Sequence, residues 1–280
     1  MSQASTAFDH TGMGPWRHDV LQIGGLAVRS QVGGQGPQVL LLHGWGGAIE
    51  SFTPVLDDLH RSHTVAAFDL PGFGKSSLPP STWGSADYAR LTLNIMERLQ
   101  LDRPHLIGHS FGGQVGIQLA SSAPERVGKL VLVCSAGIRT PPPLSTRLKR
   151  TAARLGKWLG THGGWIGEKV RAAIYHRVQS RDYANAGPLR PTLVRVINED
   201  LTPLLPLITS PTLLVWGAQD RDVPLAAAQV MARLIPSAQL VVFENAGHFA
   251  YLDQFDRFRL LVARFLREPD GRRESTSTCI

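Results

Sequence analysis

The sequence is poor in cysteine, in acidic residues and in long apolar runs. Its 280 residues include two cysteines, Cys134 and Cys279, which are too few for a disulfide framework. The first fourteen residues lack a basic start followed by an apolar run, so we expect no secretory signal. The longest apolar runs have the length of a strand, far short of a bilayer span. We therefore expect a soluble, cytoplasmic protein without stable membrane insertion.

Cofactor and metal motifs are also missing. No phosphate-cradling loop of the form Gly-x-x-x-x-Gly-Lys-Ser/Thr is present, so nucleotide cofactors are not expected. The ten histidines do not show ligand spacing with carboxylates or cysteines. We expect neither a metal nor a cofactor.

Basic residues exceed acidic ones by seven, and the excess is uneven along the chain. Residues 139–198 contain twelve Lys and Arg but only two acids, Glu168 and Asp182. Such a segment could face nucleic acid, an anionic lipid surface or an acidic substrate. No nucleic-acid-binding motif accompanies it, so we favour a solvated basic face and expect no nucleic-acid partner.

Strand-like and helix-like segments alternate along most of the chain, which predicts a parallel sheet wound with right-handed crossovers. Ser85 is expected to cap one of the helices. The predicted helices cover residues 85–99, 111–122 and 253–266, and the predicted strands cover residues 26–32, 38–42, 64–68, 105–108, 129–134, 212–216 and 239–243.

The alternation stops at residues 137–210, which show helix-like pieces and no clear strand. Because this segment is too long for a plain loop, we expect a helical cap inserted into the sheet domain. The core domain then comprises residues 15–136 and 211–267. The polar, small-residue composition of residues 1–14 and 268–280 predicts disordered tails.

The sharpest chemical signal is Gly-His-Ser-Phe-Gly-Gly at residues 108–113, between a predicted strand and a predicted helix. A strand-to-helix turn this tight strains its central residue and lifts its side chain clear of the sheet, and the flanking glycines remove side chains that would clash there. Ser110 is therefore the candidate nucleophile, and a purely structural glycine-rich turn is the alternative.

A serine hydroxyl needs a base to accept its proton, and the base needs a carboxylate to orient it. His248 follows the last predicted strand, where loops line the site in open α/β sheets. Asp220 follows the preceding predicted strand and is the preferred acid. Asp222, two residues further on, is the alternative.

The substrate oxygen that becomes negatively charged needs preorganised donors. The backbone N–H of Phe111, at the start of the helix after the serine, is one candidate. The other is the N–H of Trp45, within the His-Gly-Trp-Gly-Gly stretch at residues 43–47, and the Trp45 indole would then wall the pocket. An ordinary strand-to-helix turn is the alternative for this stretch.

These motifs, together with Asp-Leu-Pro-Gly-Phe-Gly-Lys-Ser at residues 69–76, resemble the α/β-hydrolase superfamily in order and spacing. The resemblance implies a mostly parallel central sheet flanked by helices, an inserted helical cap and hydrolysis through an acyl-enzyme. It also implies that residues 69–76 form a structural turn beneath the site. Ser110 disfavours relatives that use aspartate as the nucleophile, and His109 and Phe249 depart from the carbon–carbon bond hydrolases.

We therefore expect a serine hydrolase that acts on small or medium apolar carboxylic esters as its partner molecules. A carbon–carbon bond, lactone or thioester hydrolase with the same triad is the alternative, as is a ligand receptor on the same scaffold. The residues expected to contact substrate are Trp45, Phe111 and Phe249, with Trp158, Trp165, Tyr175 and Tyr183 from the cap.

Overall fold

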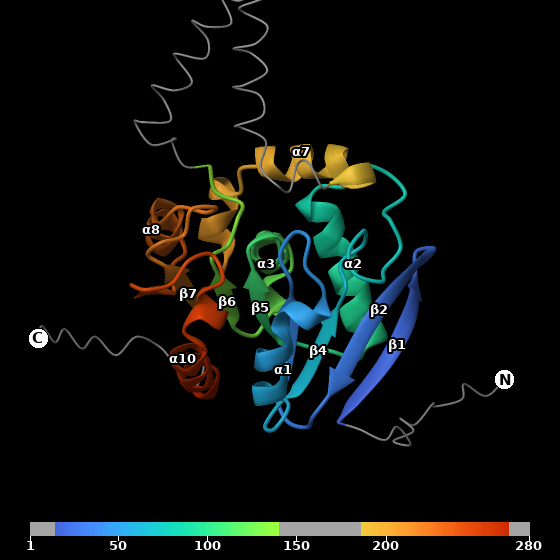
Figure 1. The fold of residues 1–280 in the computed structure, drawn as a ribbon, viewed down its shortest axis with the longest axis horizontal. Coiled ribbons are helices and arrows are strands. Elements are labelled where there is room, and N and C mark those ends of the chain that lie inside the picture. Colours follow the sequence, from blue (N-terminus) through green and yellow to red (C-terminus); the bar gives the residue numbers. More distant parts are fainter. Residues whose placement is uncertain (1–14, 140–185, 269–280) are drawn as a thin grey trace, which may run out of the picture.

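An eight-stranded sheet forms the centre of the molecule (Figure 1). The computed structural model describes residues 15–139 and 186–268. The strand order is β1-β2-β4-β3-β5-β6-β7-β8; β1 and β2 pair antiparallel to their neighbours, and all pairs from β4 to β8 are parallel. The strands are β1 (Trp16–Ile23), β2 (Leu26–Gly33), β3 (Gln38–Leu42), β4 (Thr64–Phe68), β5 (His105–His109), β6 (Leu130–Val133), β7 (Thr212–Gly217) and β8 (Ala238–Phe243).

Helices cover the sheet. The helix α2 packs against α3, and α3 lies on β5 and β6 (Figure 1). A second pair of helices, α1 and α10, also pack against each other. Because helices cover the central strands, β6 and β7 are apolar and buried along their whole length. The helices are η1 (Ile49–Phe52), α1 (Thr53–Leu59), α2 (Ser85–Arg98), α3 (Phe111–Ser122), η2 (Pro124–Arg126), η3 (Gly187–Leu189), α7 (Arg190–Asn198), η4 (Thr202–Leu207), α8 (Leu225–Leu234), α9 (Ala250–Asp253) and α10 (Phe255–Arg267).

The described part of the predicted cap segment holds η3, α7 and η4. In Figure 1, α7 lies across the ends of α2 and α3. The amide of Gln114, on α3, donates to the carbonyl of Val196 at 3.0 Å and to the carboxylate of Glu199 at 2.8 Å. That carboxylate also accepts the N–H of Ser85. The end of α7 is thereby tied to both helices.

The structure differs from the predicted elements in several places. Residues Trp16–Ile23 form an edge strand that the sequence did not predict, because only Leu21 and Ile23 are buried and no alternating apolar pattern results. Ser85 is the first residue of α2 and not its cap; Gly84 takes the cap position, and its N–H bonds to Asp87. The last predicted helix corresponds closely to α10, but the short helix α9 before it was not predicted, and neither were α1 and α8.

Among the described residues, no helix is both long and apolar enough to cross a bilayer. The boundaries of the cap stay a prediction, because residues 140–185 lie outside the described ranges. The predicted tails fall almost wholly outside those ranges as well.

Candidate active site

Ser110 stands at the turn between β5 and α3, at the carboxyl edge of the sheet. Its φ of 51° and ψ of −113° are rare for a residue with a side chain and mark a strained turn. Glycine is required on both sides. A Cβ at Gly108 would lie 2.6 Å from the carbonyl oxygen of Gly112, and one at Gly112 would lie 2.0 Å from that of Leu42. The strain and the close packing predicted for this turn are both present.

Asp220 and His248 form a hydrogen-bonded pair on neighbouring loops, after β7 and β8. His248 Nδ1 lies 2.9 Å from Asp220 Oδ2, and the aspartate side chain is fully shielded from solvent. A carboxylate can only accept here, so Nδ1 carries the proton and Nε2 is left to accept one. Among the described residues, no hydrogen bond joins the Ser110 hydroxyl to His248, a contact that often tightens only when substrate binds.

The loop after β7 decides between the two candidate acids. Asp220 Oδ1 accepts the N–H groups of Asp222 at 2.8 Å and Val223 at 2.9 Å, which turns Oδ2 toward His248. Burial alone would raise the pKa of Asp220, but these hydrogen bonds and the one from His248 outweigh it and hold the pKa below its ordinary value. Asp222 is exposed at the surface. The geometry therefore pairs His248 with Asp220.

His109, which immediately precedes Ser110, is a buried residue that sequence reasoning left without a role. Its Nε2 lies 2.9 Å from the backbone carbonyl oxygen of His248. Its ring centroid lies 4.8 Å from that of His248 and 5.0 Å from that of Phe249. The turn that carries Ser110 and the loop that carries His248 are therefore in direct contact.

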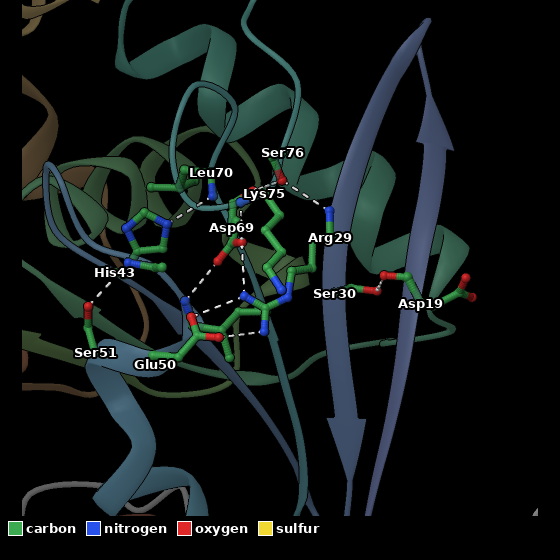
Figure 2. A network of polar contacts seen from close by, with 12 residues as sticks. Asp19, Arg29, Ser30, His43, Glu50, Ser51, Asp69, Leu70, Lys75 and Ser76 are labelled. Carbon is green, nitrogen blue, oxygen red and sulfur yellow. Dashed lines mark hydrogen bonds and ion pairs between the residues drawn. The ribbon is translucent and has the colours of Figure 1, made fainter. Parts of the chain in front are cut away.

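The loop after β3, predicted to supply an oxyanion donor, packs directly on this turn. A Cβ at Gly44 would lie 3.2 Å from Ser110 Cβ. His43 is buried and is held at both nitrogens: Nδ1 donates to the carbonyl of Gly44 at 2.8 Å, and Nε2 accepts the N–H of Leu70 at 2.9 Å (Figure 2). Burial lowers the pKa of His43, which favours the neutral ring that this bonding requires.

Asp69 is the centre of the network beneath that loop (Figure 2). Its buried carboxylate accepts the N–H of Ile49 at 2.8 Å and that of Lys75 at 2.9 Å, and it pairs with Arg29 at 3.3 Å. Arg29 also pairs with Glu50, and this hydrogen bond lowers the pKa of Glu50 to about 2. Asp69 thus joins the 69–76 turn to the start of η1 through two backbone N–H groups and to β2 through the Arg29 side chain.

Three aromatic rings, from the loop after β3, the 69–76 turn and the first residue of α3, pack on one another. The ring centroid of Trp45 lies 4.9 Å from that of Phe73 and 5.6 Å from that of Phe111. On the side of His248, Phe249 is about half exposed. Sequence reasoning selected Trp45, Phe111 and Phe249 but missed Phe73, which lies in the turn that it assigned to structure. The four cap aromatics Trp158, Trp165, Tyr175 and Tyr183 lie outside the described residues.

Asp253 supports the loop that carries His248. Its carboxylate accepts the N–H of Gly247 at 2.7 Å, directly before His248. The sequence placed Asp253 at the start of the last helix and indicated no contact with this loop.

One group of side chains here has the atoms to ligate a metal. The sulfur of Cys134, a carboxylate oxygen of Asp220 and a ring nitrogen of His248 lie within 4.8 Å of one another. Burial raises the pKa of the Cys134 thiol to about 12, however, and metals bind the thiolate. Asp220 and His248 are also bonded to each other. The group fits a hydrogen-bonded pair lined by a thiol better than a metal centre.

Comparison with known proteins agrees with this geometry. Residues 39–259 match the alpha/beta hydrolase family, and the chain belongs to it. It is 30% identical to 2-hydroxymuconate semialdehyde hydrolase of Pseudomonas putida, over 85% of this chain and 90% of that protein. It is 28% identical to pimeloyl-[acyl-carrier protein] methyl ester esterase of Aliivibrio salmonicida, over 86% and 96%.

Among solved structures, the chain is similar to a bacterial membrane phospholipase A, with a TM-score of 0.72 and 26% identity over 90% of this chain and 86% of that one. The α/β-hydrolase fold predicted from the sequence is thereby confirmed, and the chain is a hydrolase of this family.

Proposed function

We propose that the protein is a serine hydrolase of small or medium apolar carboxylic esters, with Ser110 as nucleophile, His248 as base and Asp220 as orienting acid. The observation that carries the proposal is the hydrogen-bonded Asp220–His248 pair on a loop in direct contact with the strained turn of Ser110. An aspartate that holds the imidazole and a serine lifted out of the sheet are the parts that this chemistry needs.

In the first half-reaction, the Ser110 oxygen attacks the ester carbonyl carbon while His248 Nε2 takes the hydroxyl proton. Asp220 stabilises the resulting imidazolium through Nδ1. The N–H of Phe111 has no partner within α3 because Phe111 is the first residue of that helix, so it is free to donate to the oxyanion. The N–H of Trp45 is the second proposed donor. The intermediate then expels the alcohol, which leaves with the proton from His248.

In the second half-reaction, His248 takes a proton from water, which attacks the acyl group on Ser110. The acid is released, and the proton returns to the serine oxygen. The aromatic cluster of Trp45, Phe73 and Phe111, whose last member follows Ser110 in the chain, supports the proposal that the acyl group beside the serine is apolar.

Carbon–carbon bond hydrolysis is the second candidate, and one observation favours it: the 30% identity to the semialdehyde hydrolase of Pseudomonas putida. The same triad would serve. The departures at His109 and Phe249 weigh against it, so the ester reaction is preferred.

A substrate panel separates the candidates. Initial rates would be measured for aryl esters of graded acyl length, an aryl thioester, a lactone and 2-hydroxymuconate semialdehyde, with Ser110→Ala as the control. The proposal predicts the highest kcat/KM for a short or medium ester and no turnover by the control. A clear preference for the semialdehyde would support the second candidate, and binding without turnover of any substrate would support a receptor.

A further inference from the structure

We propose that His109 is a positioning residue that fixes the loop of His248 against the turn of Ser110, so that the imidazole meets the serine in one geometry. The inference rests on the proposed function, because it assigns His109 a role in the same reaction. His109 itself touches no reacting atom in this scheme and acts through His248.

The first support is the direction of its hydrogen bond. The backbone carbonyl of His248 can only accept, so His109 Nε2 must carry the proton and donate to it across 2.9 Å. The two residues are 139 positions apart in the chain. This single bond therefore joins the residue before the nucleophile to the residue that is the base. A backbone carbonyl as partner restrains the loop itself and leaves the His248 ring free to exchange protons.

The second support is packing on both sides. The His109 ring contacts the rings of His248, Phe249 and Tyr251, with centroids 4.8, 5.0 and 5.1 Å away. On its other side lies the oxyanion loop, where a Cβ at Gly44 would come within 2.8 Å of His109 Nδ1. One buried ring therefore fills the space between the proposed base loop and the proposed oxyanion loop.

The third support is its charge state. Burial is the largest effect and, with the neighbouring His248 and His43 rings, lowers the pKa of His109 to about 3; the hydrogen bond to the His248 carbonyl and the charge of Asp220 act in the opposite direction but do not outweigh it. The ring is neutral at any pH at which the enzyme would work. It can hold His248 without adding a positive charge that would oppose formation of the imidazolium.

The test compares three variants. His109→Phe keeps a ring of similar size and removes the donor. His109→Gln places an amide N–H at about the distance of Nε2 and restores the donor. His63→Phe is the matched control. His63 is another buried histidine, but it stands just before β4, at the amino-terminal ends of the parallel strands and away from Ser110.

Four quantities would be measured for each variant: kcat and KM for the best ester, the pH profile of kcat/KM, the downfield proton resonance of the His248–Asp220 hydrogen bond, and the thermal unfolding midpoint. We expect His109→Phe to lower kcat by roughly 100-fold, the effect of a misplaced catalytic group, with little change in KM. The acid limb of its pH profile should move to lower pH, because a displaced imidazolium loses part of its stabilisation by Asp220. His109→Gln should recover most of kcat and the wild-type profile.

Three results would overturn the inference. His109→Phe could match wild type in an active enzyme. Both His109 variants could lose activity only in proportion to their loss of thermal stability, as His63→Phe would, while the resonance and the pH profile stay unchanged. That result would make His109 merely structural. His109→Gln could be as impaired as His109→Phe, which would mean that the amide donor is not what matters. An inactive wild type would instead contradict the proposed function, so the two failures are distinguishable.

Discussion

At the scale of single residues, two aspartates two positions apart have different surroundings because the loop after β7 turns only Asp220 inward, toward His248. We predict that Asp220→Asn lowers kcat for the best ester by roughly 10⁴-fold while the fold is kept, since an amide favours the wrong imidazole tautomer. The same change at exposed Asp222 should leave kcat nearly unchanged. Steady-state kinetics with circular dichroism as the folding control would check this. A larger loss at Asp222 would reverse the assignment of the acid.

Buried neutral histidines should make the protein sensitive to acid. The folded-state pKa of His109 is about 3, well below the ordinary value of 6.5, so the unfolded chain binds its proton first as the pH falls. The free energy of unfolding should therefore drop below pH 6.5, by up to about 1.4 kcal/mol per pH unit for this residue, until the pH nears 3. Urea unfolding at pH 7 and pH 5 should show a smaller drop in His109→Gln than in wild type. Equal drops would contradict the lowered pKa.

Sequence reasoning could select candidate residues where a short local motif indicates their chemistry. Ser110 lies in a glycine-flanked turn, and His248 follows a strand. The choice between Asp220 and Asp222 depended on two backbone N–H groups that orient one carboxylate, and no residue pattern encodes that orientation. His109 could not be assigned from sequence because its partner lies 139 positions away.

At the scale of elements, α3, the helix that follows Ser110, contains one glycine with no room for a side chain and another with room for a methyl group. A Cβ at Gly112 would lie 2.0 Å from the carbonyl oxygen of Leu42, whereas one at Gly116 would meet only the side-chain ends of Leu130 at 3.4 Å and Leu132 at 3.8 Å. We predict that Gly112→Ala lowers the free energy of unfolding by about 1–3 kcal/mol through overpacking. Gly116→Ala should raise it by roughly 0.5–1 kcal/mol through helix propensity. Urea unfolding would measure both, and a stabilising Gly112→Ala would show that α3 does not approach β3 so closely.

Elements were predictable where burial is complete. The strands around residues 38–42, 64–68 and 212–216 are continuous apolar runs because both of their faces are covered, and their observed bounds agree closely with prediction. The edge strand β1 is mostly exposed and carries no such signal. The helices α1 and α8 also went unpredicted. The short helix α9 also went unpredicted, and its Asp253 accepts the N–H of Gly247, a tertiary contact that helix periodicity cannot indicate.

At the scale of the whole molecule, the net charge of +7 invites the idea that electrostatic attraction governs function. The proposed substrates are neutral, and the Asp220 carboxylate is shielded from solvent and hydrogen-bonded to His248. We therefore predict that kcat/KM for a neutral aryl ester changes little as salt is raised through about 0.1 M, where the screening length is about 10 Å. Initial rates across a salt series would check this. A steep fall would instead indicate an anionic substrate or surface.

The central claim is that Ser110 is the nucleophile, and covalent labelling tests it most directly. A fluorophosphonate reacts with a serine activated by a neighbouring base and stays attached to it. Intact-mass analysis of the labelled wild type should show one equivalent of probe, and peptide mapping should place it on Ser110. Ser110→Ala should take up none, and His248→Ala should react far more slowly. Label on another serine, or undiminished labelling and ester turnover in Ser110→Ala, would contradict the account.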